Sequence, residues 1–149
     1  MRMRIQRLWT HMLKKGPMLS LGNAAVTKKE GISGDYRGKG GLLGKRQITI
    51  LSLEQWMEAC REIGQNILSS ERRANIVTTG HKYGPEDVGK QIRFEGGVIL
   101  EITGETTPCD RMDKVYPGLR KVLANWRGGA TCKVIEGGVL RELESFTIE

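Results

Sequence analysis

The chain lacks a long hydrophobic run. Its longest unbroken apolar stretch has three residues, as at Val98 to Leu100, whereas a membrane-spanning helix needs about 20. Charged residues also interrupt the N-terminus before a secretory apolar stretch can form. We therefore expect no membrane segment, no export signal and a cytoplasmic location.

Cysteine and histidine are scarce. The three cysteines, Cys60, Cys109 and Cys132, are an odd number at wide spacing, and no C-x-x-C motif occurs. This pattern argues against a disulfide framework. With only His11 and His81 in addition, the sequence does not support a structural zinc site with four protein ligands.

Aromatic residues make up only 5% of the chain, although its net charge is +7. Residues 1–46 carry eleven Lys and Arg against two acids, so the positive charge belongs to the first third. Such a region attracts phosphate-bearing ligands. No alternation of basic and aromatic residues and no known nucleic-acid-binding motif accompanies it, which argues against nucleic acid as a partner. A solvated basic surface is the alternative to phosphate binding.

Glycine is abundant, with 20 of 149 residues, against a usual share of about 7%. Glycine pairs at 96–97 and 137–138 each separate two strand-like runs and suit hairpin turns. Repeated hairpins favour antiparallel pairing, and a closed or nearly closed barrel would leave few exposed edges. The expected strands are 4–9, 47–51, 75–79, 91–94, 98–103, 130–135 and 139–141.

Two helices are expected. Ser52 caps the first, Gln55 completes a capping box, and Gly64 ends the helix. The second begins near Pro117, a residue suited to the first helical position, and ends at 128–129. Both carry apolar residues at helical spacing.

Residues 31–44 form a long glycine-rich loop whose backbone N–H groups suit an anion, with a surface loop that binds nothing as the alternative.

Cys60 and Cys132 lie on apolar faces and are interpreted as core residues. Cys109 stands in a polar segment, where Arg111 favours a thiolate and Asp110 opposes it. A thiolate binds soft metals or accepts a sulfur atom, so we favour a function for Cys109 over an inert loop thiol.

Several short motifs succeed one another along the chain. They are Gly-Ile-Ser-Gly-Asp at 31–35, Arg-Gln-Ile-Thr-Ile-Leu-Ser at 46–52, Arg-Ala-Asn-Ile at 73–76, Leu-Glu-Ile-Thr-Gly-Glu at 100–105 and Pro-Cys-Asp-Arg-Met at 108–112. Their order resembles the MOSC domain, which occurs at the C-terminus of molybdenum cofactor sulfurases and as small stand-alone proteins. The resemblance spans roughly residues 20–141, and we expect one domain over 1–149.

The resemblance implies a mainly β fold: a small closed or nearly closed barrel, akin to the pyruvate kinase barrel domain, with two or three short peripheral helices. It also implies binding of molybdopterin cofactor, or carriage of sulfur for metal–sulfur cofactors. Cys109 maps onto the family's cysteine, as molybdenum ligand or persulfide carrier. Cofactor-binding positions map onto Asp35, Arg37, Arg46, Arg73 and Asn75.

This chain departs from the family pattern at Arg37, where many members have histidine. We expect no desulfurase domain and no pyridoxal phosphate site in this chain, so transferred sulfur would come from a cysteine desulfurase partner. The sequence leaves open whether the chain binds a molybdoenzyme and whether it forms a homodimer. One alternative is a complete molybdenum-dependent reductase of N-hydroxylated compounds. A second is an anion- or nucleic-acid-binding protein without metal chemistry.

Overall fold

The structure, a computed structural model, describes residues 2–36 and 46–149. The strands are β1 (Arg4–Thr10), β2 (Leu19–Leu21), β3 (Asn23–Thr27), β4 (Gly31–Ile32), β5 (Ile48–Ser52), β6 (Ile76–Thr79), β7 (Gln91–Phe94), β8 (Ile99–Glu105), β9 (Ala130–Glu136), β10 (Gly138–Arg141) and β11 (Phe146–Ile148). The helices are α1 (Leu53–Ile63), α2 (Asp110–Val115) and α3 (Leu119–Val122), with 3₁₀ turns η2 (Ser69–Arg72) and η3 (Pro85–Asp87).

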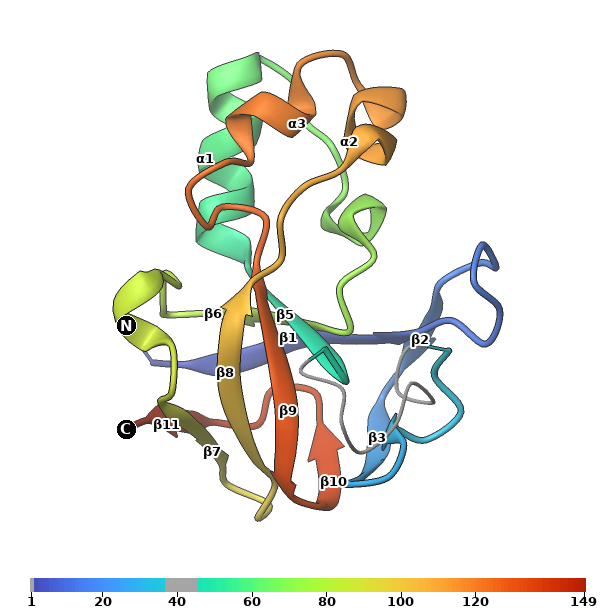
Figure 1. Cartoon of the computed structure of the whole chain (residues 1–149), viewed down its shortest axis with the longest axis vertical. Coiled ribbons are helices and arrows are strands. Elements are labelled where there is room, and N and C mark those ends of the chain that lie inside the picture. Colours follow the sequence, from blue (N-terminus) through green and yellow to red (C-terminus); the bar gives the residue numbers. More distant parts are fainter. Residues whose placement is uncertain (1, 37–45) are drawn as a thin grey trace.

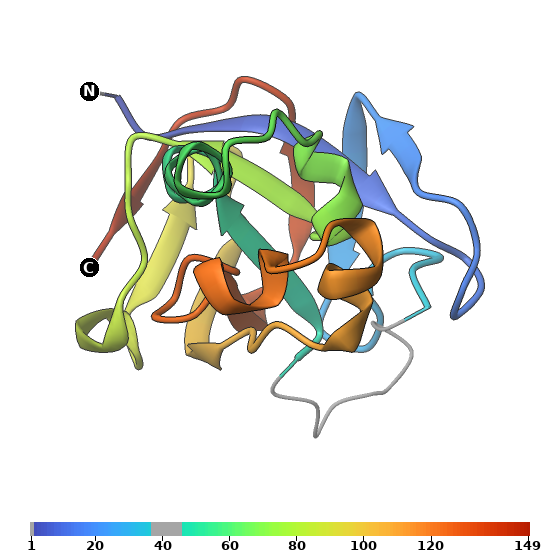
Figure 2. The same ribbon diagram turned by 90° about the horizontal axis from the view of Figure 1, so that it is seen from above.

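The described residues thus form a mainly β fold with short helices, as predicted. One sheet has eight strands in the order β11-β7-β8-β9-β5-β6-β1-β2, and a smaller sheet has the order β10-β3-β4. The three α-helices gather at one end of the molecule (Figure 1). Seen from that end, they lie over the part of the sheet that β5 and β6 form (Figure 2). No helix among the described residues is long and apolar enough to span a membrane.

Strand pairing differs from the prediction in two places. β5 and β6 are parallel, with α1 as the crossover between them; a strand buried on both faces, as β5 is, is typical of such pairs. The glycines at 137–138 do not form a hairpin, because β10 pairs with β3 in the smaller sheet. A Cβ at Gly137 would lie 2.6 Å from the Val26 carbonyl oxygen, so glycine permits this close approach. The turn at 96–97 does join the antiparallel pair β7–β8, as predicted.

The strand ladders of the described residues do not close into a ring, so the predicted barrel is not confirmed. The start of β1 nevertheless contacts the segment before β11. Arg4 forms an isolated bridge with Ser145, and the Ile5 N–H donates to the Glu144 carbonyl at 2.9 Å.

Two apolar clusters hold the fold together. The larger joins residues of both sheets, and the smaller lies between the helices and the outer face of β5 and β6. Neighbouring residues alternate between them: Ile50 and Ile76 belong to the first cluster, Leu51 and Val77 to the second. This period of two places the helices on one face of the sheet.

The helices agree with the sequence in part. Ser52 Oγ accepts the Gln55 N–H at 3.2 Å, and α1 ends at Gly64 with φ +74°, as predicted. The predicted capping box is not formed, because the Gln55 side chain bonds the Tyr83 N–H and carbonyl instead. The second expected helix begins near Pro117, as predicted, but α3 ends at Val122, because Asn125 and Trp126 adopt the left-handed conformation with φ +60° and +72° before 128–129 is reached. The sequence analysis did not predict α2, which lies before Pro117.

Candidate functional site

A pocket of about 340 Å³ opens where the ends of several elements meet near the helices. We call it the cysteine pocket. Its walls come from the segments before and within β5, between η2 and β6, after β8, and from α3. It is lined by Arg46, Thr49, Arg72, Arg73, Ala74, Thr106, Thr107, Pro108, Cys109, Arg120 and Gly128. The fold therefore brings together three residues that the sequence singled out, which lie far apart in the chain: Arg46, Arg73 and Cys109.

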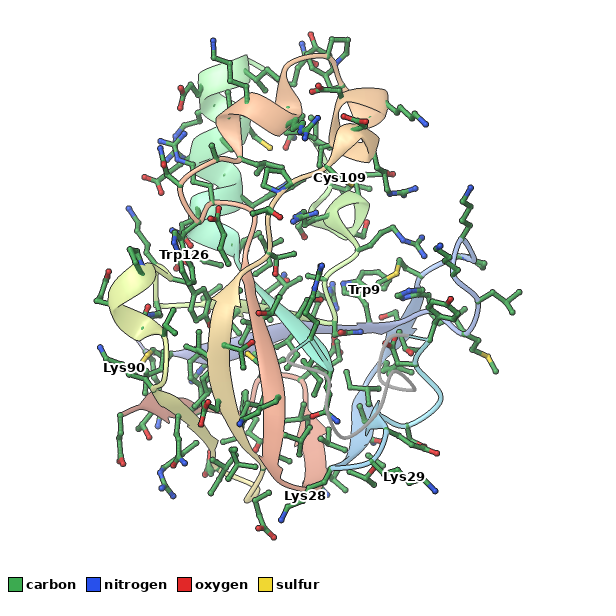
Figure 3. All side chains as sticks on the ribbon, in the orientation of Figure 1. Trp9, Lys28, Lys29, Lys90, Cys109 and Trp126 are labelled. Atoms are coloured by element: carbon green, nitrogen blue, oxygen red, sulfur yellow. The ribbon has the colours of Figure 1, made fainter. Side chains whose placement is uncertain are left out.

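Cys109 is exposed, whereas Cys60 and Cys132 are buried, as the sequence pattern indicated. Cys109 directly precedes α2 and its carbonyl accepts the Met112 N–H at 3.0 Å, which fixes the backbone at the thiol. Figure 3 shows Cys109 at the foot of α2, above Trp9 of β1. Burial raises the pKa of the Cys132 thiol, so that group stays protonated and inert. Of the three thiols, only Cys109 is placed for chemistry with a ligand.

Arg73 has an unusual backbone conformation. It ends η2 with φ +63°, and its N–H donates to the Ser70 carbonyl at 3.0 Å. An L-residue in the left-handed region costs about 1 kcal/mol, and such conformations often occur at functional sites. Glycine would adopt this conformation more easily, so the arginine side chain is retained here against a local preference.

Arg72 is a pocket residue that the sequence analysis missed. Its Nε donates to the Gly128 carbonyl at 2.7 Å and its Nη2 to the Thr106 carbonyl at 2.9 Å. Glycine at 128 favours this packing, because a Cβ there would lie 3.1 Å from the Thr106 oxygen, closer than an ordinary contact. Arg72 therefore ties the segment that leads to Cys109 to the rest of the pocket. No local pattern could have revealed this role, because both acceptors are backbone carbonyls distant in sequence.

Asp35 and Asn75, which the resemblance assigned to cofactor binding, are buried and do not line the cysteine pocket. Asn75 Nδ2 donates to Asp35 Oδ1 at 3.1 Å and to the Trp9 carbonyl at 3.2 Å. Its Oδ1 accepts the Thr49 N–H at 3.0 Å. These bonds join β1, β5 and the start of β6 beneath the pocket. They hold in position two residues of the pocket lining: Thr49, and Arg73, which lies two residues before Asn75.

Two predicted residues remain, Arg46 and Arg37. Arg46 is exposed at the pocket. Arg37 lies outside the described residues. Arg120, a cation that was not predicted, also lines the pocket and pairs with Asp110. The described residues that line the pocket include four arginines and no acid, so it suits an anionic ligand.

The donors of the cysteine pocket fit a phosphate-bearing cofactor with a metal that prefers sulfur. The Thr106 hydroxyl is buried and no described residue bonds it, which leaves a polar atom for a ligand to satisfy. The described residues contain no group of three or more His, Cys, Asp or Glu that could hold a metal. A metal at Cys109 would therefore need its other ligands from a cofactor.

His81 and Asp87 form a separate pair, with Nε2 and Oδ2 2.9 Å apart. Burial acts to raise the pKa of Asp87, but hydrogen bonds from His81, the Gly84 N–H and Lys90 outweigh it and lower that pKa below its ordinary value. These residues hold the turn around η3, and none of them lines the cysteine pocket. We assign the pair a structural role.

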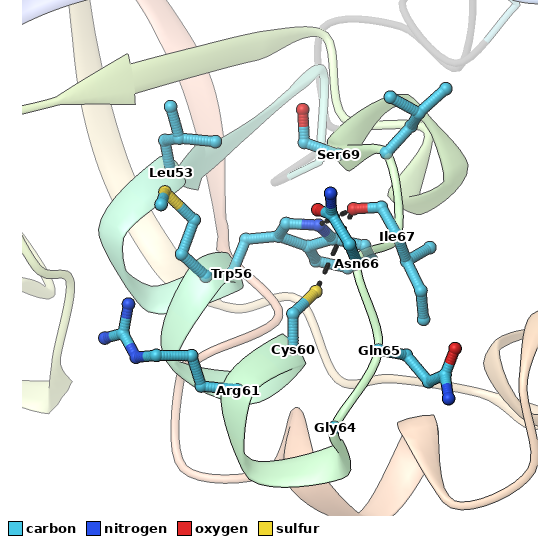
Figure 4. A pocket seen from close by; sticks show the side chains of 11 residues that line it. Leu53, Trp56, Cys60, Arg61, Gly64, Gln65, Asn66, Ile67 and Ser69 are labelled. Atoms are coloured by element: carbon cyan, nitrogen blue, oxygen red, sulfur yellow. Dashed lines mark hydrogen bonds between the residues drawn. The ribbon is translucent and has the colours of Figure 1, made fainter.

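A second cavity of about 560 Å³ follows α1 (Figure 4). We call it the α1 groove. Its lining includes the apolar side chains of Leu53, Met57 and Ile67. The polar atoms of its aromatic and thiol side chains are already used: Trp56 Nε1 and Cys60 Sγ both bond the Ile67 carbonyl, at 2.8 and 3.8 Å.

In comparisons with known proteins, this chain matches one family model and resembles several solved structures. The model of the MOSC domain matches residues 21–146. The YuaD protein from Bacillus subtilis is similar in structure, with a TM-score of 0.83, 21% identity, and coverage of 99% of this chain and 96% of that one. YiiM from Escherichia coli gives a TM-score of 0.74, 15% identity, and coverage of 100% and 70%. No curated protein matches. At these identities the structural likeness shows a shared fold.

Proposed function

The chain belongs to the MOSC domain family, and from this premise we propose that it binds the molybdenum cofactor in the cysteine pocket. The position of Cys109 among several arginines supports this proposal most directly. The exposed thiol of Cys109 lines the same hollow as Arg46, Arg73 and Arg120. A thiolate beside several cations matches a ligand that combines a sulfur-preferring metal with a phosphate.

Each part of the cofactor has a partner in this arrangement. The three arginines would hold the phosphate, and the buried Thr106 hydroxyl would bond a polar atom of the ligand. Cys109 would supply the protein ligand to molybdenum. When bound, the cofactor supplies a redox-active metal centre that exchanges oxygen or sulfur.

The chain's own residues hold the reactive thiol in place. Arg72 fixes the Thr106 and Gly128 carbonyls, and Cys109 follows Thr106 by only three residues. Its side chain is thereby committed to the scaffold. The Asp35–Asn75 network beneath the pocket supports Arg73 and Thr49 from below.

The test is to produce the protein in a host that makes the molybdenum cofactor and to measure its metal content. We expect molybdenum and pterin to co-purify with the native chain and with Cys60→Ser, whose sulfur is buried in the α1 groove. Cys109→Ser should lose the metal. A native protein without molybdenum after production in such a host would refute cofactor binding.

Sulfur carriage is a second candidate, favoured by the exposure of Cys109. The Cys109 thiolate would attack the outer sulfur of a donor persulfide, the donor's S–S bond would break, and the donor would leave as a thiolate. The step transfers one sulfur atom without net oxidation. A separate cysteine desulfurase would supply the persulfide.

Intact mass distinguishes the two candidates. After incubation with a desulfurase and cysteine, a carrier should gain the mass of one sulfur atom, which a reducing agent removes. The adduct should be missing in Cys109→Ser and present in Cys60→Ser. A chain that gains no sulfur under these conditions is not a carrier.

A further inference from the structure

A smaller hollow of about 200 Å³ adjoins the cysteine pocket. We call it the indole pocket. It shares Arg73 with the cysteine pocket, so the two hollows meet at that side chain. Its lining is Trp9, Met18, Ser70, Glu71, Arg73 and Arg111. Neither the family match nor the structural neighbours assign a role to it.

Trp9 lines this hollow, and its side chain carries an unused donor. The indole Nε1 is buried, and no described residue accepts its hydrogen bond. Leaving such a group without a partner costs about 1–3 kcal/mol, so buried donors are normally paired. The indole of Trp56, by contrast, donates to the Ile67 carbonyl at 2.8 Å.

The backbone of Trp9 is held from both sides by one residue. Its N–H donates to the Asn75 carbonyl at 2.7 Å, and its carbonyl accepts Asn75 Nδ2 at 3.2 Å. Asn75 also stands two residues after Arg73. The backbone of Trp9 is therefore fixed beside the segment that carries Arg73.

The charges around the hollow favour an anion. Arg73 and Arg111 outweigh the single carboxylate of Glu71 among the described lining residues, and Ser70 adds a hydroxyl. Arg111 follows Cys109 by two residues, so a group bound here would lie near the reactive thiol. Guanidinium groups form charge-assisted hydrogen bonds with oxyanions, so this lining favours an oxyanion over a neutral ligand.

We propose that the indole pocket binds an oxyanion of the phosphate or sulfate type, through the Trp9 N–H, Arg111 and Arg73. The oxyanion belongs either to the phosphate of the cofactor or to a separate anionic substrate. The site itself does not depend on the proposed function, because it can be occupied in protein that carries no cofactor.

The indole N–H resonances of ¹⁵N-labelled, cofactor-free protein provide the test. The chain has three tryptophans, and the variants Trp9→Phe and Trp56→Phe assign two of the signals. Titration with inorganic phosphate should shift the Trp9 signal saturably and leave that of Trp56 in place. Chloride at equal ionic strength is the control for general salt effects. A Trp9 signal that moves no more than that of Trp56 would overturn the proposal.

Two side-chain substitutions give effects of opposite sign. Arg111→Gln should weaken phosphate binding about tenfold, since a charge-assisted hydrogen bond is lost. Glu71→Gln should strengthen it about threefold, because the opposing charge is removed. Neither change touches a buried apolar side chain, so both variants should fold. Equal affinity in Glu71→Gln, Arg111→Gln and native protein would contradict a site made by these residues.

Repeating the titration on cofactor-loaded protein identifies the source of the oxyanion. If the cofactor's phosphate fills the indole pocket, the Trp9 signal is already shifted and added phosphate does not move it. If the site serves a separate substrate, phosphate shifts the signal as it does in cofactor-free protein.

Discussion

The α1 groove and the cysteine pocket both contain a cysteine and an arginine, yet they differ in what their polar atoms do. In the larger groove, the Trp56 N–H and the Cys60 thiol both bond the Ile67 carbonyl. In the smaller pocket, the Cys109 thiol is exposed and the Thr106 hydroxyl is buried without a partner among the described residues. Unsatisfied polar atoms, and not cavity size, therefore distinguish the candidate site.

The two regions are also held together differently. The groove depends on a tryptophan that is 1% exposed within the apolar cluster under the helices. The cysteine pocket depends on Arg72 and on the buried network around Asn75. A large loss of stability on substitution should therefore mark the groove, and a loss of binding or reactivity should mark the pocket.

The largest expected effect belongs to the groove. Trp56→Ala should lower the free energy of unfolding by about 3–5 kcal/mol, because it removes a buried aromatic side chain. Cys109→Ala should change it by less than about 0.5 kcal/mol, as is usual for exposed positions. Urea unfolding followed by circular dichroism measures both. Similar losses in the two variants would contradict this division between stability and function.

Thiol reactivity should show the next largest difference. In the folded protein we expect iodoacetamide to modify Cys109 about a hundredfold faster than Cys60 or Cys132, since the latter two react only after the structure opens. Peptide mass spectrometry over time identifies each site. Cys109→Ser should leave no fast-reacting thiol; a fast Cys60 would mean that the groove is open to solvent.

Arg72→Gln should lower the free energy of unfolding by about 2 kcal/mol, because two hydrogen bonds from a charged group to backbone carbonyls are lost. The matched control is Arg61→Gln, an exposed arginine that lines the α1 groove, which should change stability little. Thermal or urea unfolding of both variants measures the difference. If Arg61→Gln is the more damaging change, Arg72 does not anchor the pocket.

The smallest expected effect is the difference in stability between glycine and alanine variants, which should have opposite signs at Arg73 and at Arg61. Arg73→Gly should be about 1 kcal/mol more stable than Arg73→Ala, because glycine tolerates φ +63°. In α1, Arg61→Gly should be about 0.5–1 kcal/mol less stable than Arg61→Ala, because glycine disfavours a helix. Urea unfolding of these four variants measures both differences. The same preference at both positions would show that Arg73 is not strained.

Local chemistry determined much of the fold from the sequence alone. The α1 boundaries at Ser52 and Gly64, the turn at 96–97 and the buried state of Cys60 all follow from residues close together in the chain. The same locality explains the error at the end of the second helix. The apolar spacing favours a helix up to 128–129, but the left-handed conformations of Asn125 and Trp126 end it earlier.

Tertiary structure alone decided which distant residues meet. The sequence singled out Arg46, Arg73 and Cys109 by their motifs and composition, but only the fold places them around one hollow. It also revealed Arg72, whose acceptors lie 34 and 56 residues away, and the unused indole of Trp9. The parallel pairing of β5 and β6 was likewise decided by the tertiary structure. Contacts at such separations depend on the packing of whole strands and helices, so no local pattern of residues encodes them.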